Sequence, residues 1–154
     1  MILPSLKKFF CFILFSVILI GCESTQTASS KNLPLNFEND IKEKYWKLKT
    51  LNKEEVKMHD QQEREAYFIL KSQDNQLKGF GGCSNISGRF VLKKDKKVKM
   101  KVFSEHKTCL SSEIKEEEFL NALNKVSTYK KGSDQLILKD SSGNQLASFE
   151  AVYF

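Results

Sequence analysis

The chain has 154 residues and a formal net charge of +6 at pH 7, which first raises the question of a nucleic-acid partner. Nearly all of the positive charge is lysine, with Arg64 and Arg89 the only arginines, and no platform of aromatic and arginine residues for single strands is visible. The missing platform, together with the export signal described next, argues against a nucleic-acid partner. The length left after the N-terminal segments, about 120 residues, is enough for one hydrophobic core.

The N-terminal segment has the three parts of an export signal. A lysine pair at 7–8 precedes an apolar run over 9–20. That run is shorter than the roughly 20 apolar residues that a membrane-spanning helix needs. It closes with Leu-Ile-Gly-Cys at 19–22, which resembles the lipobox of bacterial lipoproteins, where cleavage leaves the cysteine acylated. We predict a signal peptide over 1–21 and a lipid on Cys22, with a plain secretory signal and an uncleaved anchor as alternatives.

Residues 22–36 are polar and rich in Ser and Thr, so we predict that they form the lipidated cysteine and a flexible tether. The globular domain then covers residues 37–154. The mature chain keeps two further thiols, Cys83 and Cys109, in a compartment outside the cytosol where disulfides persist. We predict a disulfide between them, which would stabilise the domain by about 3.5 kcal/mol through chain entropy.

Alternation of apolar and polar residues predicts most of the strands, most clearly in VKMKV at 98–102. The predicted strands are residues 45–51, 66–71, 76–80, 89–93, 98–102, 135–139 and 145–154. The charged segment 93–97 and the DSSGN segment 140–144 predict hairpin turns. Trp46 is the expected core anchor of the first strand. The apolar C-terminus is expected to be buried or paired.

The hydrophobic period then changes to that of a helix, predicted over 113–126. Its first turns carry Glu113 and the glutamates at 116–118, where the helix dipole favours negative charge. We interpret the cluster 116–118 as a solvated face. Ser111 or Ser112 is the expected N-cap. Strands, one helix and a final hairpin together predict an α+β fold, in which a mostly antiparallel, curled sheet packs around one main helix.

The stretch 79–88, GFGGCSNISG, places glycines and a cysteine between two predicted strands. The run lacks the Lys-Ser/Thr pair of a P-loop, and no amphipathic helix follows it. We therefore interpret Gly79, Gly81 and Gly82 as conformational residues that allow a positive φ, a bulge or close packing.

One cluster gives an alternative to a purely structural disulfide. His106 lies near Cys109 in sequence, so Cys83, His106 and Cys109 could bind Zn²⁺ or Cu⁺ through soft ligands. A convincing fourth ligand and the paired CxxC spacings of structural zinc sites are missing. A Cys–His nucleophile would also need a group that orients the histidine, and we find none. We predict no enzymatic activity, no catalytic residues, no cofactor, and a metal site only as this alternative.

The segments YWKL, AYFIL, LKGFGGCSNISGRF, EEEFLNAL and LASFEAVYF together resemble the META domain family, which includes the heat-shock lipoprotein HslJ of Gram-negative bacteria. The resemblance covers residues 45–154. It implies an α+β, HslJ-like domain whose antiparallel sheet wraps around a helix, held at the outer membrane and facing the periplasm. It also implies a link to stress response and brings no catalytic residues.

We accordingly expect a monomeric, non-enzymatic envelope lipoprotein that is attached to the membrane through the lipid on Cys22. Its expected role is stress tolerance or envelope integrity, with an envelope protein as candidate partner and no nucleic acid. The alternatives are a periplasmic metal-binding or redox module that uses Cys83, His106 and Cys109, and a protein-binding adaptor or inhibitor that adds a strand to its partner's sheet.

Overall fold

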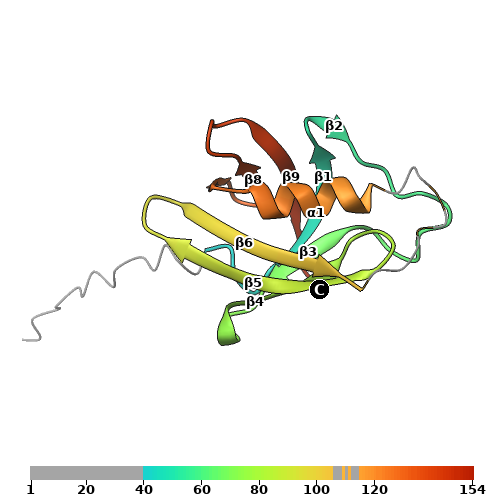
Figure 1. Cartoon of the computed structure of the whole chain (residues 1–154), viewed down its shortest axis with the longest axis horizontal. Helices are drawn as coiled ribbons and strands as arrows, with labels where there is room; N and C mark the ends of the chain where they lie inside the picture. The colour runs from blue at the N-terminus through green and yellow to red at the C-terminus, as the bar shows by residue number, and fades with distance from the viewer. Residues whose placement is uncertain (1–39, 106–108, 110, 112–114) are drawn as a thin grey trace, which may run out of the picture. The chain divides into compact units, whose positions relative to one another are not determined.

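An antiparallel sheet that closes on itself forms most of the regular secondary structure in the described residues (Figure 1). The structure is a computed structural model that describes residues 40–105, 109, 111 and 115–154. One α-helix, α1 (Glu116–Lys125), and a 3-10 helix, η1 (Gln73–Asn75), lie in these residues. The strands are β1 (Tyr45–Leu51), β2 (Glu54–Glu55), β3 (Tyr67–Leu70), β4 (Gln76–Phe80), β5 (Asn85–Lys93), β6 (Lys97–Ser104), β7 (Thr128–Lys131), β8 (Gln135–Lys139) and β9 (Gln145–Val152). The predicted α+β class, with a mostly antiparallel sheet and one α-helix in the described residues, is confirmed.

The chain divides into two units, Met1–Asn32 and Leu33–Phe154, and every described residue belongs to the second. The predicted signal peptide, Cys22 and the tether over 22–36 lie outside the described residues. Within the described part, no helix has the length and apolar character needed to cross a membrane. The hydrophobic core lies wholly within the second unit, which therefore folds around a core of its own.

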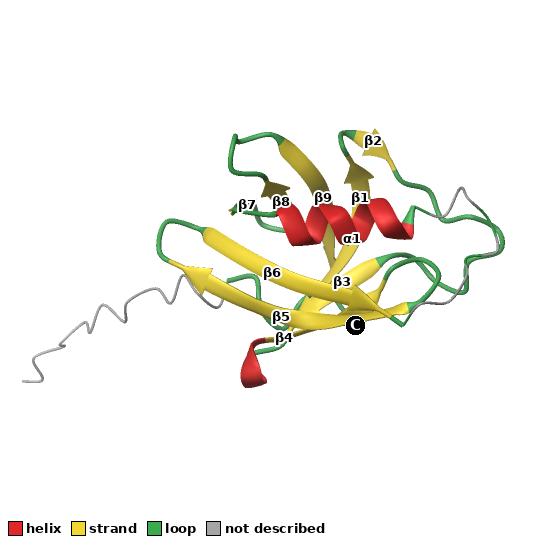
Figure 2. Ribbon diagram, in the orientation of Figure 1, coloured by secondary structure: helices red, strands yellow, loops and turns green. Residues whose placement is uncertain are grey.

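The sheet closes because β1 pairs with β9 as well as with β3. The joint between β6 and β7 is weaker, with Lys97 opposite Thr128 as its one register pair. Beyond this pair α1 packs against β6, and on its other side against β1 and β9 (Figure 2). The Asn124 amide bonds both backbone groups of Val102: Oδ1 accepts from its N–H (2.9 Å), and Nδ2 donates to its carbonyl (3.1 Å). The helix thus serves as a partner for the edge of β6 that β7 leaves uncovered.

The core is built from inward-facing residues of the strands and one face of α1. Trp46, the predicted anchor, is fully buried, and its Nε1–H donates to the carbonyl of Ile41 (2.8 Å). Phe149 lies edge-on to Phe68 at 4.9 Å between ring centroids and 6.0 Å from Phe119, so it joins the sheet to the helix. Aromatic pairs of this kind add to the stabilisation from buried apolar area.

The strand predictions at 45–51, 76–80 and 135–139 match the observed bounds, and the turns at 93–97 and 140–144 join β5 to β6 and β8 to β9. Two strands, β2 and β7, were not predicted. Each is short and carries no apolar alternation that would mark it. β5 begins at Asn85 instead of Arg89, because the second half of the glycine-rich stretch pairs with β4 in the sheet.

The helix differs from its prediction at the N-terminus. It begins at Glu116, and its N-cap is Lys115, whose side chain makes no capping hydrogen bond. Ser111 is therefore not the cap, and Ser112 lies outside the described residues. The first turn is instead fixed by Glu116, which is buried against a loop of the sheet.

The expectation that the C-terminus is buried or paired is wrong for its last two residues, which lie beyond the sheet. β9 ends at Val152, and the side chains of Tyr153 and Phe154 are exposed. Surface contacts explain their positions: the Tyr153 hydroxyl donates to Asp134 Oδ1 (2.8 Å), and the Phe154 ring lies edge-on to that of Tyr45 at 5.4 Å.

Candidate functional site

The glycine-rich stretch 79–88 forms the end of β4, a loop over 81–84 and the start of β5. The Gly81 N–H donates to the Ser84 carbonyl (2.8 Å), which closes the loop into a tight turn. Gly82 has a φ of +117°, a conformation that residues with a Cβ rarely adopt. The predicted conformational role of the glycines is therefore confirmed at Gly82.

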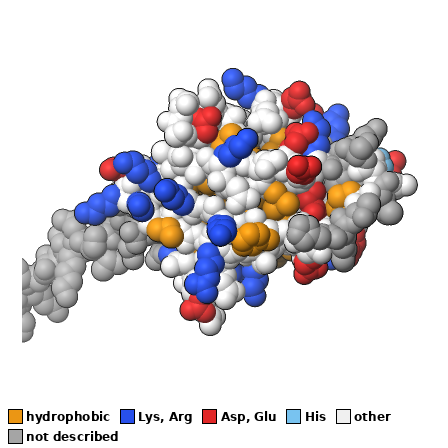
Figure 3. All heavy atoms as spheres, viewed as in Figure 1, with side chains coloured by type: hydrophobic (Ala, Val, Ile, Leu, Met, Phe, Trp, Pro, Cys, Tyr) orange, Lys and Arg blue, Asp and Glu red, His pale blue; other side chains and the backbone are white. Residues whose placement is uncertain are grey.

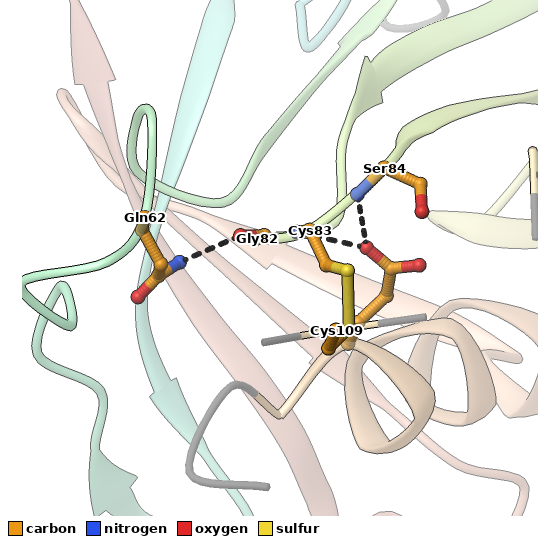
Figure 4. Close-up of a disulfide and its surroundings, with 6 residues drawn as sticks. Gln62, Gly82, Cys83, Ser84 and Cys109 are labelled. Atoms are coloured by element: carbon orange, nitrogen blue, oxygen red, sulfur yellow. Dashed lines mark hydrogen bonds between the residues drawn. A yellow bond between two sulfur atoms is a disulfide. The ribbon is translucent and has the colours of Figure 1, made fainter. Parts of the chain in front are cut away.

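The turn presents two backbone N–H groups to the buried carboxylate of Glu116. Glu116 Oε2 accepts from the Ser84 N–H at 2.6 Å and from the Cys83 N–H at 3.0 Å (Figure 4). Glu116 is 6% exposed and Ser84 is fully buried, so water does not compete freely for these bonds. Hydrogen bonds to an ionised group are among the stronger ones in proteins. The carboxylate therefore ties the start of α1 to the loop between β4 and β5.

Gly81 makes room for that carboxylate. A Cβ at position 81 would lie 2.6 Å from Glu116 Oε2 and 2.7 Å from its Cγ. Real Cβ atoms essentially never approach other atoms this closely, so any other residue at 81 would displace the Glu116 side chain. The buried position of the Glu116 side chain therefore depends on the absence of a Cβ at Gly81.

The same loop carries the disulfide, because Cys83 is bonded to Cys109 (Figure 4). The two Cα atoms lie 5.4 Å apart, within the usual range for a disulfide. The bond connects the loop to the segment that leads from β6 into α1. The predicted pairing of Cys83 with Cys109 is therefore present in the structure.

Two neighbours complete the surroundings. The Gln62 side-chain amide donates to the Gly82 carbonyl (3.2 Å), which joins the segment before β3 to the loop. The Lys115 ammonium donates to Glu54 Oε2 (3.0 Å) in β2, and this hydrogen bond raises the pKa of Lys115 above its ordinary value. Polar side chains thus join the loop to the segment before β3, and the residue before α1 to β2.

The metal cluster given as an alternative to the disulfide is only partly assembled among the described residues. Cys83 and Cys109 are brought together, but each sulfur is used in the disulfide, and His106 lies outside the described residues. Glu116 instead stands beside the cysteines: its carboxylate and the two sulfurs offer ligand atoms within 4.8 Å of one another. A metal would need the thiolate forms, so this donor set is available only after reduction.

Glu116 does not lie on the solvated face that the run of glutamates predicts. It faces the sheet, while Glu117 and Glu118 are exposed. Its spacing could have revealed this: Glu116, Phe119 and Leu123 recur at helical intervals on the buried face.

The comparisons with known proteins agree with this architecture. The family model described as "META domain" matches residues 39–153. None of the curated proteins matches the chain in sequence.

The solved structures that resemble this one share its fold at low sequence identity. A protein from Burkholderia xenovorans, solved by NMR, superposes with a TM-score of 0.58 at 19% identity over 74% of this chain and 85% of its own. A DUF4847 family protein from Bacteroides vulgatus gives a TM-score of 0.51 at 18% identity over 74% of this chain and 96% of its own. Likeness at this level supports the fold. Since the family model spans most of the sequence, the chain belongs to the META domain family.

Proposed function

We propose that this protein is a non-enzymatic envelope lipoprotein whose META domain acts in stress tolerance or envelope integrity. In this proposal residues 1–21 are the signal peptide and Cys22 carries the lipid. Residues 22–36 join the lipid to the domain at the outer membrane, facing the periplasm. The domain acts through contacts with an envelope component and not through catalysis.

The observation that carries the proposal is the disulfide between Cys83 and Cys109. Disulfides form and persist in oxidising compartments and are rare in the cytosol. A domain that closes a loop with such a bond is suited to the cell envelope, which agrees with the export signal. The resemblance of residues 19–22 to a lipobox then supports a lipid anchor as the means of attachment.

A structural role for the polar groups of the loop supports a function without catalysis. A cysteine nucleophile must be a free thiolate, and both sulfurs here are bonded to each other. The Glu116 carboxylate accepts two backbone hydrogen bonds, as a group that fixes a loop would. These residues are accounted for by the architecture.

A metal-binding or redox module remains the second candidate, because the ligand atoms of Cys83, Cys109 and Glu116 lie within 4.8 Å of one another. Stoichiometric zinc or copper on protein purified from the periplasm, measured by metal analysis, would favour it over the lipoprotein scaffold alone. An adaptor that adds a strand is less favoured. The described sheet closes through β1 and β9, and its short β2 offers little free edge.

The proposal is tested on the full chain expressed in a Gram-negative host supplied with labelled palmitate. We expect the wild-type protein to incorporate label and to sediment with outer membranes, and Cys22→Ser to lose both the label and normal processing. Cys83→Ser is the matched control, since it removes a cysteine but leaves the lipobox intact. Normal processing and membrane attachment of Cys22→Ser would overturn the lipoprotein assignment.

A further inference from the structure

The outer face of β4, β5 and β6 is strongly basic. Strand alternation sends the exposed residues of β5 and β6 to this face. Its cations are Lys78, Arg89, Lys93, Lys97, Lys99 and Lys101. We call these residues the basic face. Figure 3 shows blue Lys and Arg side chains gathered over the β5–β6 hairpin, with orange apolar side chains among them.

The cations of the basic face oppose one another across the strands. Arg89 is paired in register with Lys101, and Lys93 with Lys97. Like charges directly opposite each other destabilise a sheet. Within the described part of the chain, the recorded ion pairs involve other cations. Among the described residues, no carboxylate forms an ion pair that would compensate the repulsion on the basic face.

The outer face of β1 and β9 shows the opposite arrangement. Lys49 on β1 lies 3.4 Å from Glu150 on β9, and Lys47 lies 3.9 Å from Glu65. Lysines on that face thus have acidic partners on neighbouring segments. The lysines of β1 are thus neutralised within the domain, whereas the described residues form no ion pairs with the cations of the basic face. This difference points to an anionic partner outside the domain for the basic face.

Apolar side chains stand among these cations. Val91 is 52% exposed and Phe103 is 56% exposed, which makes them two of the large apolar side chains that the described surface leaves to solvent. The Phe103 ring lies opposite Ser87 in register, with Lys101 Nζ 5.6 Å from its centroid. Phe103 also borders a shallow recess of about 420 Å³, whose rim includes Lys78, Arg89 and Lys101.

We propose that the basic face docks on an anionic phospholipid surface, with Lys and Arg on the headgroup phosphates and Phe103 and Val91 in the interfacial layer. Cations and exposed apolar side chains on one surface suit both parts of such an interface. The inference rests on the proposed lipid at Cys22, which would hold the domain within reach of the membrane. A flexible tether of the predicted length has a mean span of about 20 Å, so lipid phosphate is always at high local concentration.

The test uses residues 33–154, which contain the hydrophobic core of the described residues, and therefore measures binding by the basic face without the lipid. The probes are vesicles of phosphatidylglycerol and phosphatidylethanolamine in equal parts, and vesicles of phosphatidylcholine, in a sedimentation assay. We expect binding only to the anionic vesicles, weakening as salt is raised. The triple variant Arg89→Gln, Lys99→Gln and Lys101→Gln should bind roughly 100-fold more weakly, since each cation near an anionic surface contributes about fivefold.

The matched control is Lys53→Gln, Lys57→Gln and Lys130→Gln, which removes the same charge from exposed positions elsewhere. Equal weakening by both triple variants would overturn the proposal, because net charge alone would then explain the binding. Tighter binding to heparin or to single-stranded DNA than to the vesicles would also overturn it. If residues 33–154 do not bind anionic vesicles while the full chain is still acylated at Cys22, the docking proposal is wrong and the lipoprotein proposal is unaffected.

Discussion

Replacing Glu116 by alanine tests whether a buried carboxylate holds the helix against the sheet. In the wild-type protein, Glu116 Oε2 is the acceptor for the N–H groups of Cys83 and Ser84. Glu116→Ala removes the acceptor and leaves both donors behind. The Ser84 donor is the more serious loss, because Ser84 is fully buried and water cannot replace the carboxylate there.

The expected magnitude follows from these two bonds. A hydrogen bond to a charged group contributes about 1.5–3 kcal/mol, and a buried donor without a partner costs about as much. Cys83 is only half-buried, so its N–H regains some hydrogen bonding from water. Relief from burying the charge offsets part of the loss. We therefore expect Glu116→Ala to lower the free energy of unfolding by about 2–4 kcal/mol and Glu116→Gln by about 1 kcal/mol.

The assay is urea unfolding of residues 33–154 with the disulfide intact, followed by tryptophan fluorescence. Trp46 is the only tryptophan and is fully buried, so its emission reports loss of the core. Glu117→Ala is the matched control: it also removes a carboxylate from the first turn of α1, but from an exposed position. We expect the control to change stability by less than about 0.5 kcal/mol. Equal midpoints and slopes for the two variants would refute the structural role of Glu116.

A double-mutant cycle with Gly81 sharpens the test. Gly81→Ala should destabilise the wild-type protein, because the added Cβ would meet the Glu116 side chain at 2.6–2.8 Å. In the Glu116→Ala background that side chain is gone, and the same substitution should cost much less. The coupling energy should lie in the range of about 0.5–3 kcal/mol seen for contacting residues. Strict additivity would mean that the glycine is needed for another reason.

Reducing the disulfide is expected to lower the free energy of unfolding by about 3.5 kcal/mol, since it spans a sequence separation of 26 residues; unchanged urea midpoints with and without reductant would contradict this. Asn124→Ala removes the side-chain hydrogen bonds to the N–H and the carbonyl of Val102. Because these bonds are only part-buried, we expect the free energy of unfolding to fall by about 1–2 kcal/mol. Faster amide exchange at Val102 should accompany that loss, and protection as in the wild type would contradict it. Hydrogen bonds from the side chain and then the backbone N–H of Asn144 hold the pKa of Asp140 below its usual value. Since the pKa of Asp140 is lower in the folded state than in the unfolded state, its ionised form stabilises the fold above about pH 4. This stabilisation is lost as the pH falls through the folded pKa. An ordinary Asp140 pKa in a carboxyl NMR titration would contradict the prediction.

The sequence predicted the strands best where one face is buried and the other is exposed. β6 alternates strictly, and β1, β4 and β8 have their predicted bounds. β7 reads TYKK, too short and too polar to stand out, although Tyr129 within it is buried. The closure of β1 on β9 joins the two ends of the domain, and local periodicity holds no information about such a pairing.

The disulfide of the site could be predicted from the sequence, but the hydrogen bonds of Glu116 could not. If Cys11 is removed with the predicted signal peptide and Cys22 carries the predicted lipid, Cys83 and Cys109 are the two thiols left to pair, so elimination points to the disulfide. Glu116 was misassigned because a run of glutamates at a helix start fits the helix dipole equally well when it is exposed. What decides its burial is the space left by Gly81, a contact between segments far apart in sequence.

Four residues within the segments that resemble the family hold α1 to the sheet. Gly81, Gly82 and Cys83 position the loop, and Glu116 receives it. Such residues specify an architecture, so a function particular to this chain is expected on a surface that the architecture leaves free. The basic face meets that condition, because its cations neither enter the core nor pair with described carboxylates. Neutralising Arg89, Lys99 and Lys101 should therefore leave the urea midpoint almost unchanged or slightly raised while it weakens vesicle binding. Glu116→Ala should do the reverse, lowering the midpoint while the folded protein still binds. A loss of both properties in either variant would show that the loop and the basic face are not separable, and the division between scaffold and binding surface would fail.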